Sequence, residues 1–340
     1  MALVAENDQH AYQIAAGKEG RLKGHKFEEL VSEELNALDL SKADYLVTLS
    51  SPNIYQGNPA AALFEHISKD KNRTISRIQS YWLGGLATAG KGASITNEEG
   101  EVVTGSKSDV LLDITYADGG KEKIGVSVKA CKNNAQVALT TSSAFCDMLR
   151  ANGISVTPDA EIGLKMFCGD PGYSPADGFH PKDSSNIPPN RKARPERYYW
   201  EEMPTQVQEE WEHILNHYQD KITALILQKA NAYKTDDYMP AYILHECKPH
   251  EDIQDCQVAV VSMDEFTQYS RLFDTFGIKE KKVQKGRYKG IDTAIHKYPH
   301  FGFIQFQPIG NAQNFSELQF NLKSNYYKQF SKLMLEENDD

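Results

Sequence analysis

Two short apolar segments joined by a glycine-containing turn limit the fold of this chain more than any other feature. Residues 109–116 read Asp-Val-Leu-Leu-Asp-Ile-Thr-Tyr, and residues 123–130 read Lys-Ile-Gly-Val-Ser-Val-Lys-Ala. Between them, residues 117–120 read Ala-Asp-Gly-Gly, a sequence that typically reverses the chain between antiparallel strands. The sequence therefore predicts a β-hairpin over residues 109–130.

Polar side chains interrupt one face of each predicted strand. Because strand side chains alternate, Asp109 and Asp113 share one face of the first strand, while Ser127 and Lys129 share one face of the second. An unpaired charge inside a sheet is costly, so we expect both polar faces to border one cleft. A carboxylate beside an ammonium suits phosphodiester hydrolysis, because carboxylate oxygens bind Mg²⁺ and the ion lowers the pKa of a bound water.

The rest of the chain mixes helical and strand-like patterns, which predicts an α/β fold with a mixed central β-sheet flanked by helices. Apolar residues at helical spacing predict helices over residues 25–39, 59–71, 72–83 and 206–231. Apolar runs predict strands at 239–246, 257–263, 301–306 and 318–322. Prolines, glycines and serines predict a long loop over 170–196.

Short motifs at the two hairpin strands carry a family resemblance. Ser108-Asp109 at the first strand and Ser127-Val128-Lys129 on the second resemble the PD-(D/E)XK nuclease superfamily, and in particular type II restriction endonucleases. The resemblance implies a restriction-endonuclease-like core and Mg²⁺-dependent cleavage of double-stranded DNA at a short specific sequence, with Mn²⁺ as a substitute. It also implies a homodimer and a cognate DNA methyltransferase as partner. Asp109 and the Val128 carbonyl would be metal ligands, and Asp109, Lys129 and Ser127 would be catalytic residues.

The sequence departs from the family motif at two positions. Ser108 replaces the usual proline, and Ser127 replaces a carboxylate, although a hydroxyl cannot supply the negative charge of a metal ligand. We expect Ser127 to act at most as a hydrogen-bond partner to a water at the metal. The acids that could replace it are Glu28, Asp113 and Asp147.

Glu28 is the favoured replacement for the missing carboxylate, both as a catalytic residue and as a metal ligand. Residues 24–31 resemble the first helix of Holliday-junction resolvases, in which a glutamate at the matching position lines the active site. Asp113 would lie about 13 Å further along its strand than Asp109. Asp147 falls on a predicted helix after the hairpin. A solvated first helical turn also accounts for an acid at residue 28.

The net charge of −10 does not favour a nucleic-acid partner, but two segments are locally basic. Residues 279–297 carry seven Lys/Arg against two acids, and residues 182–197 carry five against two. The predicted DNA-binding residues are Lys281, Lys282, Lys285, Arg287, Lys289, Arg191, Lys192 and Arg194. We therefore expect a catalytic core over residues 1–270 with an inserted loop at 170–196, and C-terminal strands and loops for DNA contact over residues 271–335 as part of the same domain.

Cysteine and histidine positions raise the alternative of a zinc site. His245, Cys247, His250 and Cys256 lie close in sequence, but their spacing matches no standard zinc finger, so buried cysteines and surface histidines are favoured. The odd number of cysteines favours reduced thiols in the cytoplasm. The absence of a signal-peptide pattern and of a long apolar stretch agrees with that localisation.

Two other functions remain open at this stage. A structure-specific nuclease, of the junction-resolvase or repair type, would use the same core. A catalytically inactive DNA-binding protein would account for Ser127, although such a protein has no chemical need for Lys129.

Overall fold

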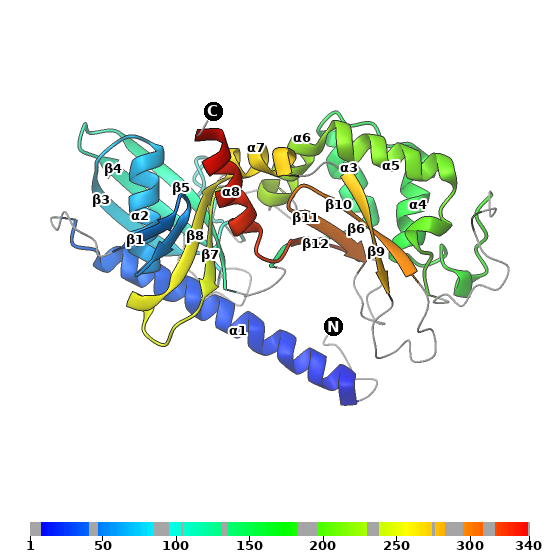
Figure 1. Ribbon diagram of the computed structural model, residues 1–340, viewed down its shortest axis with the longest axis horizontal. Helices are drawn as coiled ribbons and strands as arrows, with labels where there is room; N and C mark the ends of the chain where they lie inside the picture. The colour runs from blue at the N-terminus through cyan, green and yellow to red at the C-terminus, as the bar shows by residue number, and fades with distance from the viewer. Residues whose placement is uncertain are drawn as a thin grey trace. The chain divides into compact units, whose positions relative to one another are not determined.

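The computed structural model places its described residues in two compact units (Figure 1). The described residues are 8–40, 47–84, 95–103, 105–130, 135–182, 186, 196–229, 238–273, 276–282, 295–308 and 317–338. The first unit is drawn from residues 1–135, 227–266 and 324–340, and the second from residues 136–226 and 267–323. The units interleave along the chain, which differs from the expected division near residue 270.

A seven-stranded sheet forms the centre of the first unit, in the order β1-β2-β8-β7-β5-β4-β3. Its strands are β1 (Thr48–Ser51), β2 (Ile54–Gln56), β8 (Gln257–Ser262), β7 (Pro240–Lys248), β5 (Lys121–Lys129), β4 (Val110–Tyr116) and β3 (Ile75–Trp82). β5 and β7 are parallel, and the other neighbours are antiparallel. The predicted α/β class with a mixed central sheet is therefore confirmed, as are the strands predicted at 239–246 and 257–263.

The predicted hairpin is formed by β4 and β5. Val110 pairs with Val126 and Asp113 with Lys123, so the register follows the alternation of apolar and polar residues. Gly119 turns the chain with a φ of 87°, a conformation that strongly favours glycine. Local sequence was sufficient to specify this hairpin because its turn and its alternation agree.

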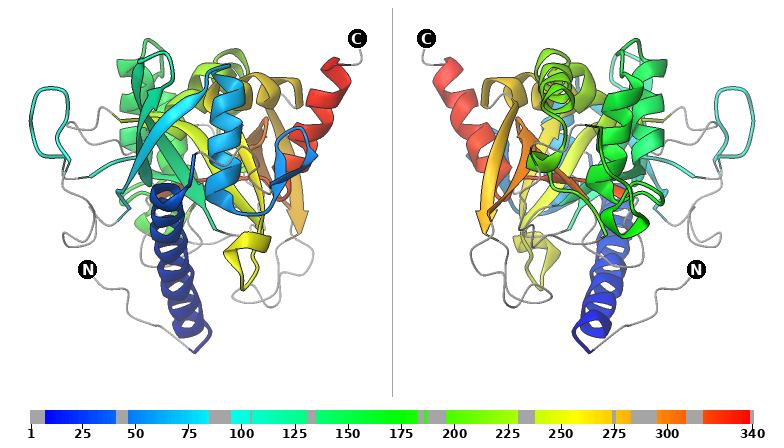
Figure 2. Two further views of the ribbon diagram at one scale, coloured as in Figure 1. Left: turned by 90° about the vertical axis from the view of Figure 1, so that its left-hand side faces the viewer. Right: turned by 90° about the vertical axis from the view of Figure 1, so that its right-hand side faces the viewer.

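Helices α1 (Asp8–Ala37) and α2 (Pro59–Asp70) cover one face of this sheet (Figures 1 and 2). Val31 and Leu35 from α1 and Leu63 from α2 are fully buried against Leu112 and Val126 of the hairpin. The helix predicted over 59–71 is therefore confirmed, and the one predicted over 25–39 is the second half of a longer helix. On the opposite face, α8 (Tyr326–Asn338) packs its Tyr326 and Tyr327 rings against β7.

An asparagine on α1 forms hydrogen bonds with backbone groups at the edge of the sheet. The Asn36 side-chain amide donates to the Ser80 carbonyl at 2.9 Å, and the Ser80 N–H donates back to the Asn36 side-chain oxygen at 2.8 Å. The hydroxyls of Ser32 and Ser80 are also 2.8 Å apart. These contacts fix α1 on β3, whose outer edge would otherwise expose unpaired backbone groups.

The helix predicted over residues 72–83 is wrong, because this segment is β3. Ile75, Ile78 and Trp82 have helical spacing, but the segment pairs along its length with β4. This pairing outweighs the local preference, as tertiary contacts often do in short segments. The helix predicted over 206–231 is interrupted. It consists of α5 (Thr205–His217), α6 (Gln219–Ala224) and a π-helical turn (Leu225–Lys229).

The second unit holds a five-stranded antiparallel sheet in the order β6-β12-β11-β10-β9. Its strands are β6 (Gln136–Thr141), β12 (Glu317–Leu322), β11 (Ile304–Pro308), β10 (Ile295–Phe301) and β9 (Phe276–Lys282). Its remaining helices are α3 (Ser142–Ala151), α4 (Pro158–Cys168) and most of α7 (Met263–Phe273), with short 3₁₀ turns at Pro175–Asp177 and Trp200–Glu202. A further 3₁₀ turn, Ile253–Asp255, belongs to the first unit.

Aromatic side chains form the core of the second unit. The Phe145 ring stacks on Trp211 at 6.1 Å, and Trp200 meets Phe306 edge-on at 5.8 Å. Phe320 from β12 joins the same cluster. Such pairs add to the hydrophobic effect of burial. The predicted strands 301–306 and 318–322 thus supply core residues, although Gly302 divides the first of them between β10 and β11.

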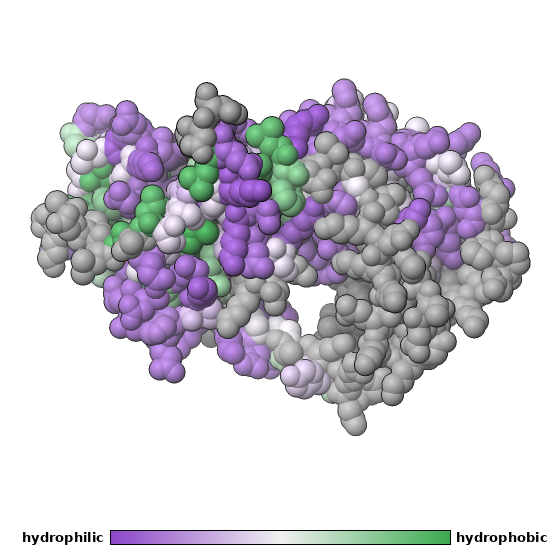
Figure 3. Space-filling model, in the orientation of Figure 1, coloured by the Kyte–Doolittle hydropathy of each residue, from purple (hydrophilic) through white to green (hydrophobic). Residues whose placement is uncertain are grey.

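None of the described helices combines the length and the apolar character needed to cross a membrane. Over the described residues, the face shown in Figure 3 is mostly hydrophilic, with smaller apolar patches.

Candidate active site

The end of the hairpin brings the two principal candidate residues together. Asp109 immediately precedes β4, and its backbone N–H donates to the Val126 carbonyl at 2.9 Å. Its side-chain Oδ2 accepts hydrogen bonds from the Val128 N–H at 2.7 Å and from Lys129 Nζ at 3.2 Å. The Ser127 hydroxyl also donates to this oxygen, at 3.2 Å. Three consecutive residues of β5 therefore hold one carboxylate.

The Asp109–Lys129 ion pair is only partly shielded from solvent. Their side chains are 21% and 19% exposed, respectively. A charge-assisted hydrogen bond in such a setting is stronger than one between neutral groups, and it fixes both side chains. The partial exposure leaves room for an external ligand, so this ion pair differs from one sealed inside a core.

Glu28 reaches the same site from α1. Its residue is 7% exposed, and burial raises the pKa of its carboxyl to about 7. The negative charge of Asp109 contributes to the increase, whereas the indole of Trp82 and the ammonium of Lys129 oppose it. Two carboxylates are thus held close enough to repel one another. This position agrees with Glu28 as the favoured replacement for the acid missing at Ser127.

Residues 82–84, at the end of β3, hold both acids in place. The Trp82 Nε1–H donates to Glu28 Oε2 at 3.3 Å. The N–H groups of Leu83 and Gly84 donate to the Asp109 carbonyl at 2.8 and 3.1 Å. A Cβ atom at Gly84 would lie 2.0 Å from Glu28 Oε2, so any larger residue there would displace the Glu28 carboxylate. The sequence pattern did not indicate this role, because the segment was assigned to a helix.

Asp109 also depends on close packing behind the hairpin. The Ser108 hydroxyl donates to the Tyr238 carbonyl. A Cβ atom at Gly125 would lie 2.6 Å from that carbonyl and 2.2 Å from the Ser108 hydroxyl oxygen. Gly125 therefore allows the chain before β7 to approach β5. The serine thus anchors the start of β4 by a hydrogen bond.

The oxygen donors at this site fit a hard divalent cation. Asp109 and Glu28 supply two carboxylates, and a cation between them would offset the repulsion that raises the pKa of Glu28. Among the described residues, no group of three or more His, Cys, Asp or Glu side chains is placed to hold a metal. The coordination of Mg²⁺ would therefore need the Val128 carbonyl, water and a substrate phosphate as well. Ser127 instead donates to Asp109, so it acts as a neutral partner of that acid.

A second lysine, which the sequence did not predict as a site residue, lies near the site. Lys107 is half-buried, and its pKa is lowered to about 8, first by burial and then by the positive charge of Lys129. Asp109 opposes this decrease. The signal in the sequence was its position two residues before Asp109, which places both residues on the same side of an extended segment.

Of the two other acids considered for the site, Asp113 lies away from Asp109 in the first unit, and Asp147 belongs to the second unit. Asp113 is four residues further along β4 than Asp109 and pairs across the sheet with Lys123. Asp147 belongs to the second unit, on α3, where its side chain is 74% exposed and forms an ion pair with Arg150 at 3.3 Å. Within the first unit, Glu28 is thus the candidate that is brought to Asp109.

The alternative zinc site does not form. His245 and Cys247 lie on the face of β7 that α8 covers, and the His245 ring stacks on Tyr326 at 5.6 Å. Cys256 is buried in the core on the opposite face of the sheet, while His250 is exposed between β7 and β8. Burial raises the pKa of the Cys247 thiol to about 12. In this part of the chain, all of it described, the four side chains do not converge on one metal.

The predicted DNA-binding residues fall largely outside the described part of the chain. Lys281 and Lys282 end β9, and only their backbone is described. The others lie outside the described residues: Lys285, Arg287, Lys289, Arg191, Lys192 and Arg194. Their roles therefore stay predictions.

Comparison with known proteins finds a structural similarity at low sequence identity. The chain matches no protein-family model, and it has no significant match among curated protein sequences. Its structure is similar to the crystal structure of restriction endonuclease MspI in complex with its cognate DNA. The two chains share 12% sequence identity with a TM-score of 0.43, over 77% of this chain and 78% of MspI.

Proposed function

We propose that this protein is a Mg²⁺-dependent endonuclease that hydrolyses phosphodiester bonds of double-stranded DNA at a short specific sequence. The observation that carries the proposal is the convergence of Asp109, Lys129 and Glu28 at the end of the β4–β5 hairpin. Two carboxylates with a partly exposed ammonium match the needs of phosphodiester hydrolysis, which requires a cation site and a positive charge beside the phosphate.

Each residue of the site has a distinct role in the proposed reaction. Asp109 and Glu28 would hold Mg²⁺, for which Mn²⁺ could substitute, together with the carbonyl of Val128. When bound, the ion lowers the pKa of a water and neutralises charge that develops on the phosphate. Lys129 Nζ donates hydrogen bonds to the attacking water and to a phosphate oxygen. Its contact with Asp109 at 3.2 Å restricts the ammonium to the position where that charge develops.

Three neighbouring residues would position these groups without taking part in the chemical step: Trp82, Gly84 and Ser127. The indole N–H of Trp82 restrains the Glu28 carboxylate, and Gly84 leaves space for it. The Ser127 hydroxyl restrains Asp109. Preorganisation of this kind lowers the reorganisation needed during the reaction.

Sequence specificity and assembly are the less direct parts of the proposal. The basic segments 182–197 and 279–297 would contact phosphates and base edges. A homodimer with two-fold symmetry would match a palindromic DNA site and cut both strands. A cognate DNA methyltransferase would protect the same sequence, and the pair would act in the cytoplasm as a restriction–modification system.

Incubation of plasmid DNA of known sequence with the protein tests this function. With Mg²⁺ or Mn²⁺ we expect discrete fragments whose mapped ends share one short sequence. Excess EDTA should abolish cleavage, because the reaction depends on an oxygen-ligated hard cation. Full cleavage in EDTA would contradict the mechanism, and no cleavage with either cation would favour an inactive DNA-binding protein.

A structure-specific nuclease is the second candidate, and the position of Glu28 favours it. This acid enters the site from the first helix, as the sequence resemblance to Holliday-junction resolvases implies. The same assay separates the two functions if a four-way junction is included. Cleavage of the junction without cleavage of linear duplex would identify a resolvase.

A further inference from the structure

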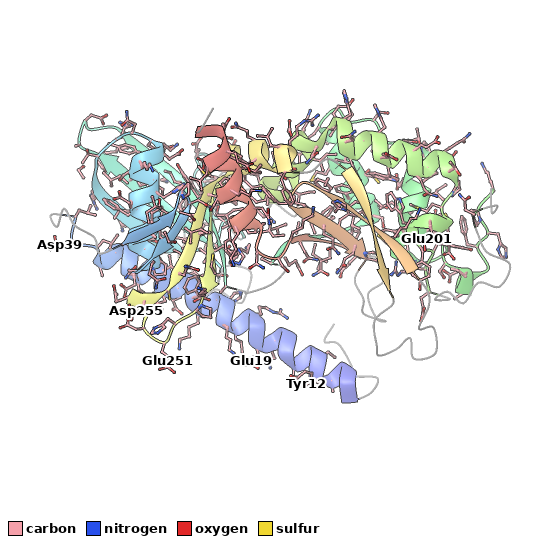
Figure 4. The ribbon with its side chains drawn as sticks, in the orientation of Figure 1. Tyr12, Glu19, Asp39, Glu201, Glu251 and Asp255 are labelled. Carbon is pink, nitrogen blue, oxygen red and sulfur yellow. The ribbon has the colours of Figure 1, made fainter. Side chains whose placement is uncertain are left out.

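The first half of α1 extends beyond the part of the helix that packs on the sheet. The helix enters the core of the first unit at Phe27, and Val31 and Leu35 are fully buried after it. Before residue 24, the described side chains of α1 are mainly exposed. Figure 4 shows Tyr12 and Glu19 on this part of the helix, which extends past the strands of the first unit. Tyr12 is 76% exposed, so burial in this unit does not account for the extension.

One face of the extension continues the face that carries Glu28. Lys18, Arg21, His25 and Glu28 are spaced by three, four and three residues, which places them on the same side of a helix. Ser32, four residues after Glu28, contacts β3 from this side. A row of basic side chains therefore leads along α1 to the candidate active site.

The charge on this face is available to a partner. Lys18 and Arg21 are exposed, and neither forms an ion pair with another described residue of the first unit. Lys23, on the opposite side of the helix, pairs with Glu19 at 2.8 Å. Lys18 and Arg21 thus present positive charge that no ion pair among the described residues neutralises.

Three glycines in this part of α1 leave space around the helix. Gly17 lies one residue before Lys18 and four before Arg21, and a Cβ atom there would meet no atom within 4 Å. The same is true of Gly20, and at Gly24 the nearest atom is the Glu28 carboxylate at 3.9 Å. Glycine inside a helix costs about 1 kcal/mol relative to alanine, and internal packing does not require these three.

We propose that Lys18 and Arg21 bind the phosphate backbone of duplex DNA next to the phosphate that is cleaved. This inference rests on the proposed nuclease function and names the DNA segment that the site would engage. With a rise of 1.5 Å per residue, Arg21 is about 10 Å and Lys18 about 15 Å from Glu28 along the helix. Successive phosphates of one strand advance about 3.4 Å along the duplex, so both residues reach within a few phosphates of the cleaved bond.

Salt dependence of DNA binding provides the test. The probe is a 30-base-pair duplex of random sequence in EDTA, so that binding is measured without cleavage. We expect the Lys18→Ala/Arg21→Ala variant to bind more weakly, with a slope of log K against log salt reduced by about two, one for each lost phosphate contact. A charge-retaining Lys18→Arg/Arg21→Lys variant should keep the wild-type slope.

The matched control removes two lysines from the other side of the same helix. Lys23→Ala/Lys26→Ala makes the same change in net charge, but these residues point away from the Glu28 face. The control should keep a slope near that of the wild type. Equal slopes for the wild type and Lys18→Ala/Arg21→Ala, or equal reductions in both double variants, would overturn the inference.

Plasmid cleavage by the wild type in Mg²⁺, measured in parallel, separates this inference from the proposed function. Cleavage with unchanged slopes would leave the nuclease standing and overturn the role of α1. A reduced slope for Lys18→Ala/Arg21→Ala alone would support the DNA contact even where the wild type does not cleave. Failure of the wild type to bind the duplex would overturn it.

Discussion

The Lys129 ammonium lies 3.2 Å from Oδ2 of Asp109, the same oxygen that the Val128 N–H approaches to 2.7 Å. Three donors on β5 thus surround one carboxylate oxygen, counting the Ser127 hydroxyl. This arrangement directs the second oxygen, Oδ1, to other ligands. Under the proposed function, Ser127 would orient Asp109 while Glu28 would supply the second negative charge at the cation site.

Replacement of Glu28 tests the source of that charge. Glu28→Gln keeps the shape of the side chain but removes one carboxylate from the proposed cation site. We expect the cleavage rate to fall by several orders of magnitude and DNA affinity to stay nearly intact, as measured by single-turnover cleavage and by binding in EDTA. A mild effect would exclude Glu28 and move the test to Asp113 and Asp147.

Ser127→Ala provides the contrasting variant at the motif position. The hydroxyl makes one hydrogen bond to Asp109, worth about 1 kcal/mol, so we expect a loss of cleavage rate of about fivefold. The same single-turnover assay measures it. A loss as large as that of Glu28→Gln would show that Ser127 does more than restrain Asp109.

The end of β3 should matter to catalysis through Glu28. Trp82→Phe keeps a ring but removes the N–H that lies 3.3 Å from Glu28 Oε2. We expect a moderate loss of cleavage rate, about tenfold, with little change in DNA affinity or in the melting temperature. Gly84→Ala should be more severe, since the added Cβ would lie 2.0 Å from the same oxygen. If Trp82→Phe reduced the cleavage rate by the same factor in the wild type and in Glu28→Gln, the effect of Trp82 would not pass through Glu28, which would contradict this prediction.

Loss of the contact between α1 and the edge of the sheet should lower the free energy of unfolding. Asn36→Ala removes two hydrogen bonds to the backbone of Ser80, and we expect a decrease of about 1–2 kcal/mol in the free energy of unfolding. Urea denaturation measures this value. Glu33→Ala, at an exposed position of the same helix, is the control and should change the free energy by less than about 0.5 kcal/mol. Equal values for both variants would mean that water replaces the asparagine at no cost.

The basic segment 279–297 carries a separate prediction about DNA affinity. Lys→Glu changes at Lys281, Lys282 and Lys285 should weaken binding and reduce the salt slope by about one for each lost phosphate contact. Binding of duplex DNA over a range of salt concentrations measures both effects. An unchanged slope would show that this segment faces solvent.

The elements best predicted from sequence are those whose signals are local. The β4–β5 hairpin followed from the turn at 117–120 and from alternation, and the structure confirms it. β3 was mistaken for a helix because Ile75 and Ile78 share helical spacing, whereas pairing with β4 determines its conformation. The division into two units depends on β6 pairing with β12, nearly two hundred residues later in the chain. No local pattern contains that information.

The candidate site divides in the same way between local and distant signals. Asp109 and Lys129 could be placed together from the hairpin alone. Glu28 came from a resemblance between short segments, since eighty residues of chain separate it from Asp109. Trp82 and Lys107 were missed because their contribution lies in burial and in the charges around them. Those properties depend on the folded chain.

The most direct measurement is the rate of plasmid cleavage in Mg²⁺ by Asp109→Asn and Lys129→Ala, with Asp113→Asn, on β4, as a matched control. If the end of the hairpin is the active site, both variants should lose cleavage while they retain the wild-type circular dichroism spectrum, and Asp113→Asn should cleave near the wild-type rate. Cleavage by either Asp109→Asn or Lys129→Ala within about tenfold of wild type, a barrier change of only ~1.4 kcal/mol, would contradict this assignment.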